Sequence, residues 1–201
     1  MTFRAPPKPT DERAKLTAQL IREGGTDTER WVQSENLATQ WDARAAMVAE
    51  HIPAGSSVLD VGAGAMTLAS LLKPGCAYQP ADVVERRPGC FVVDLNRHEF
   101  PPGNYDFVTF LGVLEYVHDI DWPLRSARFA APRMIVTYCT DIGADPALRR
   151  GMGWVNDLSA SEFAARLANN GWAIDASLEV KRGPSNIQLM YLCSRDASAP
   201  A

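Results

Sequence analysis

The stretch VLDVGAGAMTLASLL (residues 58–72) begins as an apolar strand and continues as a helix. Asp60 lies near the end of the apolar run, and Gly62 and Gly64 follow at once. Glycine permits a tight turn and lets the backbone approach a ligand closely. The helix directs the positive end of its dipole to the same place. The pattern predicts a ligand site between strand and helix. A simple turn in which Asp60 caps the helix would have the same sequence pattern.

Short apolar runs and helical patterns alternate after this stretch. Strand-like runs occupy residues 77–84, 90–95, 105–113, 133–139, 172–180 and 186–194. Alternation of strands with helices indicates a parallel α/β sheet. The last two runs are joined by KRGPS (residues 181–185), a turn-like connection that favours an antiparallel pair at one edge. We therefore expect an α/β fold with a Rossmann-like, doubly wound, mostly parallel seven-stranded sheet, an antiparallel edge strand and preceding N-terminal helices.

The chain divides into three parts by its composition. Residues 1–52 hold three early prolines and then about two helical patterns, which predict an N-terminal arm and a helical cap. Residues 53–195 form the expected cofactor-binding core. Residues 196–201, with the sequence DASAPA from 196, are expected to be a flexible tail.

Charge and cysteine usage narrow the class of protein. The net charge of −4 and a sequence pI near 5.4 give no general attraction for nucleic acid or anionic membranes. Residues 85–87 and 148–150 are short basic runs, expected on solvated faces. The four scattered cysteines predict no metal site and suit a reducing cytoplasm. The N-terminus lacks a signal-peptide core, and no apolar run is long enough for a bilayer, so we expect a cytoplasmic protein.

Two ligand classes use glycines after a first strand. A dinucleotide site favours GxGxxG, but the third position here is Thr67. Asp60 would also add negative charge beside a pyrophosphate. It suits a ligand with an ammonium group and no phosphate, and S-adenosylmethionine is such a ligand. A nicotinamide-dependent oxidoreductase stays as an alternative.

With these residues the sequence resembles the class I S-adenosylmethionine-dependent methyltransferases. The first motif of that family is commonly (V/L)LDxGxGxG, and VLDVGAGAM departs from it only at Met66. Further stretches over residues 41–195 resemble the family's later strands in the correct order. The resemblance implies S-adenosylmethionine as cofactor and methyl transfer to an oxygen or nitrogen of a small-molecule acceptor. The acidic net charge predicts no nucleic-acid or membrane partner, and the oligomeric state is left open. A non-catalytic binder of the same cofactor is a further alternative.

The resemblance also implies which residues surround the cofactor. Asp82 would accept both ribose hydroxyls, Asp94 and Leu95 would flank the adenine, and Leu111 and Gly112 would lie beside the cofactor at the fourth strand. The complete set expected to bind cofactor is Asp60, Gly62, Ala63, Gly64, Asp82, Val83, Asp94, Leu95, Leu111 and Gly112.

Candidate acceptor-side residues follow the fourth and fifth strands, except Trp41, which lies in the helical segment before the first strand. His118 is the favoured general base because its ordinary pKa lies near neutrality, and Asp119 would orient it or act instead. Positioning alone, with no base, is the other possibility. The residues expected near the acceptor are Trp41, Tyr116, Trp154 and Asn156, although both tryptophans would also serve as core anchors.

Overall fold

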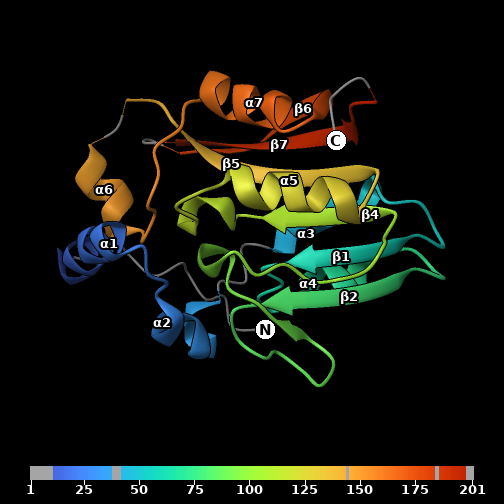
Figure 1. Ribbon diagram of the computed structural model, residues 1–201, viewed down its shortest axis with the longest axis horizontal. Helices are drawn as coiled ribbons and strands as arrows, with labels where there is room; N and C mark the ends of the chain where they lie inside the picture. The colour runs from blue at the N-terminus through green and yellow to red at the C-terminus, as the bar shows by residue number, and fades with distance from the viewer. Residues whose placement is uncertain (1–10, 38–41, 144, 184–185, 198–201) are drawn as a thin grey trace.

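A seven-stranded sheet forms the centre of the protein (Figure 1). The computed structural model describes residues 11–37, 42–143, 145–183 and 186–197. The strand order is β3-β2-β1-β4-β5-β7-β6. The strands are β1 (Ser57–Val61), β2 (Ala77–Asp82), β3 (Phe91–Val92), β4 (Phe107–Leu111), β5 (Arg133–Asp141), β6 (Trp172–Arg182) and β7 (Asn186–Arg195).

The strand directions confirm the predicted fold class. The pairs β1–β2, β1–β4, β2–β3 and β4–β5 are all parallel. β7 is antiparallel to both β5 and β6, so the antiparallel pair lies at one edge with β7 on its inner side. The sheet order reverses next to β1 and β4, which is where ligands bind in open α/β sheets.

Helices cover both faces of the sheet, as a doubly wound fold requires (Figure 1). α5 (Asp121–Ala130) and α7 (Ala160–Asn169) contribute to one core cluster, together with Leu59, Val61 and Val136 from the strands. α3 (Asp42–Glu50) and α4 (Thr67–Leu71) contribute to the other, with Val58 and Ile135. Alternate residues of β1 and β5 therefore face opposite layers, since successive side chains of a strand point to opposite faces.

The N-terminal helices lie over one end of the sheet (Figure 1). They are α1 (Asp11–Glu23) and α2 (Thr28–Val32), followed by a 3-10 turn, η1 (Ser34–Asn36). α1 packs against α6 (Pro146–Gly151), and Thr17 Oγ1 lies 2.9 Å from the backbone oxygen of Arg150. The Arg30 guanidinium donates to the backbone oxygen of Met152 at 2.8 Å. These contacts join α1 and α2 to the segment that follows β5. Residues 11–37 are called the cap below.

α3 belongs to the packed core as well as to the first fifty residues. Its Ala45 and Val48, with Ile52 just beyond it, are at most 4% exposed and pack beneath the sheet. The division of the chain at residue 52 stays a prediction.

The expectation that both basic runs are solvated is wrong at two arginines. The Arg86 side chain is 8% exposed and pairs with Asp82. Arg149 is 2% exposed, and its Nε donates to Asp157 at 2.7 Å. In each run an acid brought close by the fold pairs with the guanidinium, which permits its burial.

Candidate functional site

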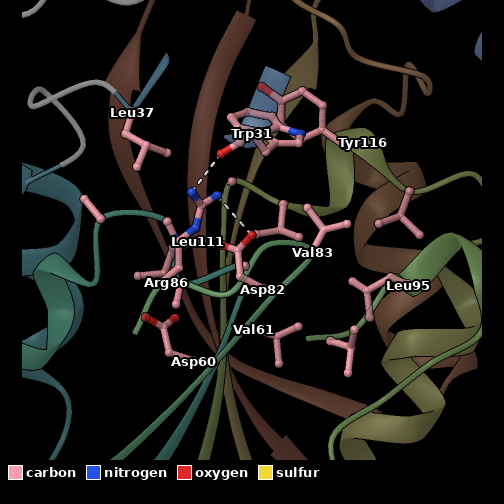
Figure 2. A pocket seen from close by; sticks show the side chains of 18 of the residues that line it. Trp31, Leu37, Asp60, Val61, Asp82, Val83, Arg86, Leu95, Leu111 and Tyr116 are labelled. Carbon is pink, nitrogen blue, oxygen red and sulfur yellow. Dashed lines mark hydrogen bonds and ion pairs between the residues drawn. The ribbon is translucent and has the colours of Figure 1, made fainter. Parts of the chain in front are cut away.

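One cavity opens at the carboxyl ends of β1, β2 and β4, beneath the cap (Figure 2). It encloses about 1040 Å³ when the space at its open mouth is counted. All ten residues expected to bind cofactor line it: Asp60, Gly62, Ala63, Gly64, Asp82, Val83, Asp94, Leu95, Leu111 and Gly112. The structure therefore brings the predicted set together, and the role of each residue stays a prediction.

The turn from β1 to α4 has the backbone shape that its glycines suggest. Gly62 has φ +75°, and a Cβ there would lie 2.2 Å from Val113 Cγ2, so no larger residue fits. Met66 replaces the last glycine of the motif yet adopts φ +57°, ψ +29°. This left-handed conformation is strained for a residue with a side chain. The substitution thus keeps the turn and adds strain to it.

Asp60 is buried at the floor of the cavity, with 2% of its surface exposed. The Tyr78 hydroxyl donates to its Oδ2 and the Thr109 hydroxyl to its Oδ1, each at 2.7 Å. Burial raises the pKa of Asp60, while these two hydrogen bonds and the charge of Arg44 oppose that rise. Each oxygen of Asp60 accepts one of these hydrogen bonds and keeps a further acceptor position. The arrangement therefore suits a carboxylate that also accepts from a cationic donor in the cavity.

Asp82 ends β2 and is held by three donors of this chain. The backbone N–H of Gly64 donates to Oδ2 at 2.8 Å, and that of Val84 donates to Oδ1 at 3.3 Å. The Arg86 guanidinium donates to Oδ1 at 3.1 Å and to the backbone oxygen of Trp31 at 2.7 Å. Figure 2 shows Arg86 between Asp82 and Trp31, so this arginine connects the predicted ribose acid to the cap.

Asp94 follows β3 and contacts the cap directly. Its Oδ1 accepts hydrogen bonds from Thr26 Oγ1 at 2.8 Å and from the backbone N–H of Asn96 at 3.0 Å. The Asn96 amide in turn donates to Thr26 Oγ1 at 2.9 Å. Thr26 and Asn96 both line the cavity, so the turn before α2 forms part of its wall.

Arg44 is a cavity residue that sequence reasoning missed. It comes from α3, is 9% exposed and lies so close to Gly112 that a Cβ there would be 2.4 Å from its guanidinium. Burial lowers the pKa of Arg44, and the charge of Glu115 opposes this. A buried guanidinium beside the ends of β1 and β4 can bind a carboxylate in a bidentate manner. No sequence motif marked it, because the signal is one arginine in an ordinary helix.

Aromatic side chains form the wall of the cavity on the cap side (Figure 2). Trp31 and Tyr116 contact edge to face, with ring centroids 5.0 Å apart. The Arg30 guanidinium lies 4.4 Å from the Trp31 ring centroid and 5.4 Å from that of Tyr116. Among the predicted acceptor-side residues that the structure describes, Tyr116 lines this cavity.

Trp154 and Asn156 lie outside the lining of the cavity. Trp154 is 7% exposed and packs against the Arg149 guanidinium, outside the cavity lining. The Asn156 amide donates to the backbone oxygens of Leu114 and Val117 at 2.8 and 2.9 Å and accepts from Tyr138. These contacts hold loops rather than face the cavity. Trp41 lies outside the described residues.

His118 and Asp119 are outside the cavity lining as well. The His118 Nε2 lies 3.0 Å from the backbone oxygen of Gly25, and its backbone N–H donates to Asn96. Asp119 Oδ1 accepts from the first backbone N–H groups of α5. The structure gives both residues contacts that hold the cap and begin a helix, and their catalytic role stays a prediction.

The donor set of the cavity fits S-adenosylmethionine. Asp82 matches a ribose diol, Asp60 an ammonium group and Arg44 a carboxylate. The apolar side chains of Val83 and Leu95 suit the faces of an adenine ring. Gly62 and Gly112 carry no side chain at the cavity floor, and a Cβ at these positions would meet Val113 and Arg44 respectively.

Two further classes of site are absent from the described part of the chain. No group of three or more histidine, cysteine, aspartate or glutamate side chains is placed to hold a metal ion there. Nor does any helix in it combine the length and the apolar character that crossing a membrane requires.

Comparison with known proteins identifies the family. A family model for the methyltransferase domain matches residues 33–177, and no functionally curated protein matches the sequence. Among solved structures, the 1,6-didemethyltoxoflavin-N1-methyltransferase of Burkholderia thailandensis, with bound 1,6-didemethyltoxoflavin and S-adenosylhomocysteine, is 19% identical. Its TM-score is 0.62, over 96% of this chain and 92% of that one. Magnesium protoporphyrin IX methyltransferase from Synechocystis, with bound S-adenosylhomocysteine, is 16% identical with a TM-score of 0.61, over 92% and 100% of the chains. Mitomycin 7-O-methyltransferase is 20% identical with a TM-score of 0.61, over 89% and 60%.

The structural similarities, all at or below 20% identity, show the shared fold. The family match covers most of the chain and includes the β1–α4 turn and the acids Asp60, Asp82 and Asp94 at the ends of three strands. The chain therefore belongs to the methyltransferase domain family and is a class I S-adenosylmethionine-dependent methyltransferase.

Proposed function

We propose that this methyltransferase transfers the methyl group of its cofactor to an oxygen or nitrogen of a small aromatic acceptor by in-line displacement. The cofactor supplies a methyl group on a positively charged sulfur, and the residues of this chain supply position. In this proposal Asp82 holds the ribose hydroxyls, Asp60 the ammonium group and Arg44 the carboxylate of the cofactor's amino-acid end. Val83 and Leu95 pack against the adenine.

The aromatic wall supports an aromatic acceptor. Trp31 and Tyr116 line the cavity on the side of the cap, away from Asp60 at its floor (Figure 2). Aromatic rings present broad apolar area with preferred offset or edge-to-face geometry, which favours a flat ring as ligand. The names of the similar structures include an N1-methyltransferase and a 7-O-methyltransferase, which supports nitrogen or oxygen as the methylated atom.

Positioning, rather than a histidine base, is the proposed source of catalysis. Displacement at a sulfonium methyl needs the nucleophile in line at near-attack distance, and orientation alone contributes much of the rate. Among the described residues that line the cavity there is no histidine. His118 instead contacts the cap through Gly25.

The proposed acceptor is a small molecule, and the proposed location of the protein is a reducing compartment. The net charge of −4 disfavours nucleic acid and anionic membranes as partners. All four cysteines are free thiols, which supports the cytoplasm as location.

The observation that carries the proposal is that three carboxylates from three strand ends, a buried guanidinium and two aromatic rings face one cavity. Calorimetric titration with S-adenosylhomocysteine, NAD and NADP tests the cofactor assignment. We expect binding of S-adenosylhomocysteine alone, weakened at least about tenfold in Asp82→Ala. Binding of NAD, or unchanged affinity in Asp82→Ala, would contradict the site assignment.

A screen of aromatic hydroxyl and amine compounds for S-adenosylhomocysteine production tests the acceptor class. Trp31→Ala should raise the acceptor KM about tenfold and change S-adenosylhomocysteine affinity less than about twofold. Val32→Ala, at an exposed position of the same helix, is the matched control. Cofactor binding without turnover on any acceptor would favour a non-catalytic scaffold.

A further inference from the structure

Asp60 has two partners in this structure that the sequence did not indicate. We propose that Tyr78 and Thr109 are positioning residues for the cofactor: their hydroxyl groups orient the Asp60 carboxylate toward the cofactor's ammonium group. This inference rests on the proposed function, because it takes Asp60 as the group that binds the ammonium.

The two hydroxyl groups come from the strands on either side of Asp60. β1 lies between β2 and β4, and Asp60 pairs in register with Pro80 on one side and Thr109 on the other. Tyr78 is two residues before Pro80, so it lies on the same face of β2, and its long side chain reaches Asp60. The carboxylate is therefore held from both neighbouring strands, which are rigid elements of the sheet.

Each hydroxyl occupies a different carboxylate oxygen. Tyr78 donates to Oδ2 and Thr109 to Oδ1, both at 2.7 Å, the short distance of a bond to a charged acceptor. Each hydroxyl has one hydrogen, so neither can donate elsewhere while it holds Asp60. A carboxylate has about four acceptor positions, so about two remain on Asp60, which lines the cavity. Those positions can accept from an ammonium group.

Burial makes this support necessary. Asp60 and Thr109 are 2% and 0% exposed, so water does not stabilise the carboxylate. The charged and titratable groups that face Asp60 are Arg44 from α3 and Tyr78 and Asp82 from β2. Burial raises the pKa of Asp60, the hydroxyl bonds and Arg44 oppose this, and Asp82 adds to it. Burial and the neighbouring charge of Asp60 also raise the pKa of Tyr78, so its hydroxyl stays protonated and donates.

Removing one hydroxyl should therefore weaken binding in two measurable ways. The carboxylate loses its orientation, and its pKa rises further. Because the ionised form binds the ammonium, affinity is lost as the pH falls through the pKa of Asp60. In a variant without one hydroxyl that loss should begin at a higher pH.

The experiment compares two ligands that differ at the amino-acid end. S-adenosylhomocysteine carries the ammonium and carboxylate groups, whereas 5′-methylthioadenosine has neither. Calorimetry from about pH 5 to pH 8 on Tyr78→Phe and Thr109→Val should show S-adenosylhomocysteine affinity reduced about tenfold near neutrality. Affinity for 5′-methylthioadenosine should be unchanged. Thr109→Ser, which keeps the hydroxyl, should restore the affinity.

Two controls separate the possible failures. Tyr105→Phe removes a hydroxyl that donates to the backbone oxygen of Pro102 on the surface, and should change neither affinity. If Tyr78→Phe and Thr109→Val lower the affinities for both ligands equally, or lower neither affinity, the proposal is overturned. Asp60→Asn decides which idea is wrong. If it weakens S-adenosylhomocysteine binding while both hydroxyl variants do not, the positioning role alone fails. If it has no effect, the ammonium-binding role of Asp60 in the proposed function fails with it.

Discussion

Replacing Arg86 by methionine should tighten the binding of S-adenosylhomocysteine. Asp82 accepts from Gly64, Val84 and Arg86, which uses three of about four acceptor positions on its carboxylate. Two ribose hydroxyls need two positions, so one existing donor has to leave. The Gly64 and Val84 donors are backbone groups fixed by the turns, so Arg86 is the donor that can move.

The magnitude follows from the burial of the ion pair. The Arg86 and Asp82 side chains are 8% and 7% exposed, so solvent screens their interaction little. A hydrogen bond to a charged group contributes about 1.5–3 kcal/mol to stability. If the cofactor displaces Arg86, this energy stabilises only the cofactor-free protein. Its loss should then lower the Kd by about tenfold, taking the low end of the range. The unfolding free energy without ligand should fall by about 1.5–3 kcal/mol.

Calorimetry with S-adenosylhomocysteine and thermal unfolding with and without it measure the two effects. Arg87→Met is the matched control, because Arg87 is exposed and lies over the Tyr78 ring, 5.6 Å from its centroid, instead of pairing with Asp82. It removes the same charge from the same loop and should leave the Kd nearly unchanged. Weaker binding in Arg86→Met would refute the reasoning, since it would mean that the guanidinium stays and helps to hold the ligand.

Three further variants test the turn, a buried ion pair and the cap. Met66→Gly should raise the melting temperature by about 2–4 °C, because glycine relieves about 1 kcal/mol of left-handed strain; an unchanged value in calorimetry would contradict this. Arg149→Met should lower the unfolding free energy in urea by about 1.5–3 kcal/mol, because it removes the hydrogen bond from the buried Arg149 guanidinium to Asp157 while Arg150 still pairs with that acid; a loss under about 1 kcal/mol would mean a surface-like pair. His118→Ala should speed hydrogen exchange around Gly25 while the single-turnover methyl-transfer rate changes less than about threefold; a rate loss of a hundredfold would restore His118 as a base.

The strand-end acids could be predicted because their signal is local. Asp60, Asp82 and Asp94 each follow an apolar run, and carboxyl ends of parallel strands lie along one edge of a sheet. The order of the runs therefore placed all three acids in one cavity before any contact was known. The same reasoning found Gly62 and Gly64, whose positive φ values the turn requires.

The arginines could not be predicted because their environment depends on distant segments. Arg86 contacts Trp31, fifty-five residues earlier, and Arg149 is buried by Asp157 and by the backbone oxygen of Cys139. A basic run is ordinarily solvated, and here nearby acids, Asp82 and Asp157, together with backbone oxygens of other segments reverse this preference. The position of His118 could not be predicted either. It was selected for the ordinary pKa of its side chain, and its ring contacts the backbone of Gly25 in the cap.

The contacts of the three acids also divide the site into two parts with different responses. Asp94 accepts from Thr26 of the cap, while the hydroxyl groups of Tyr78 and Thr109 that donate to Asp60 come from the sheet. Thr26→Val should therefore loosen the cap at the adenosine end of the site. The affinities for S-adenosylhomocysteine and for 5′-methylthioadenosine should fall by the same factor, about threefold for the loss of one hydrogen bond with a neutral donor. Thr28→Val, at the start of α2, is the matched control. A selective loss of S-adenosylhomocysteine in Thr26→Val would contradict the division, because the cap would then act on the amino-acid end that Asp60 is proposed to bind.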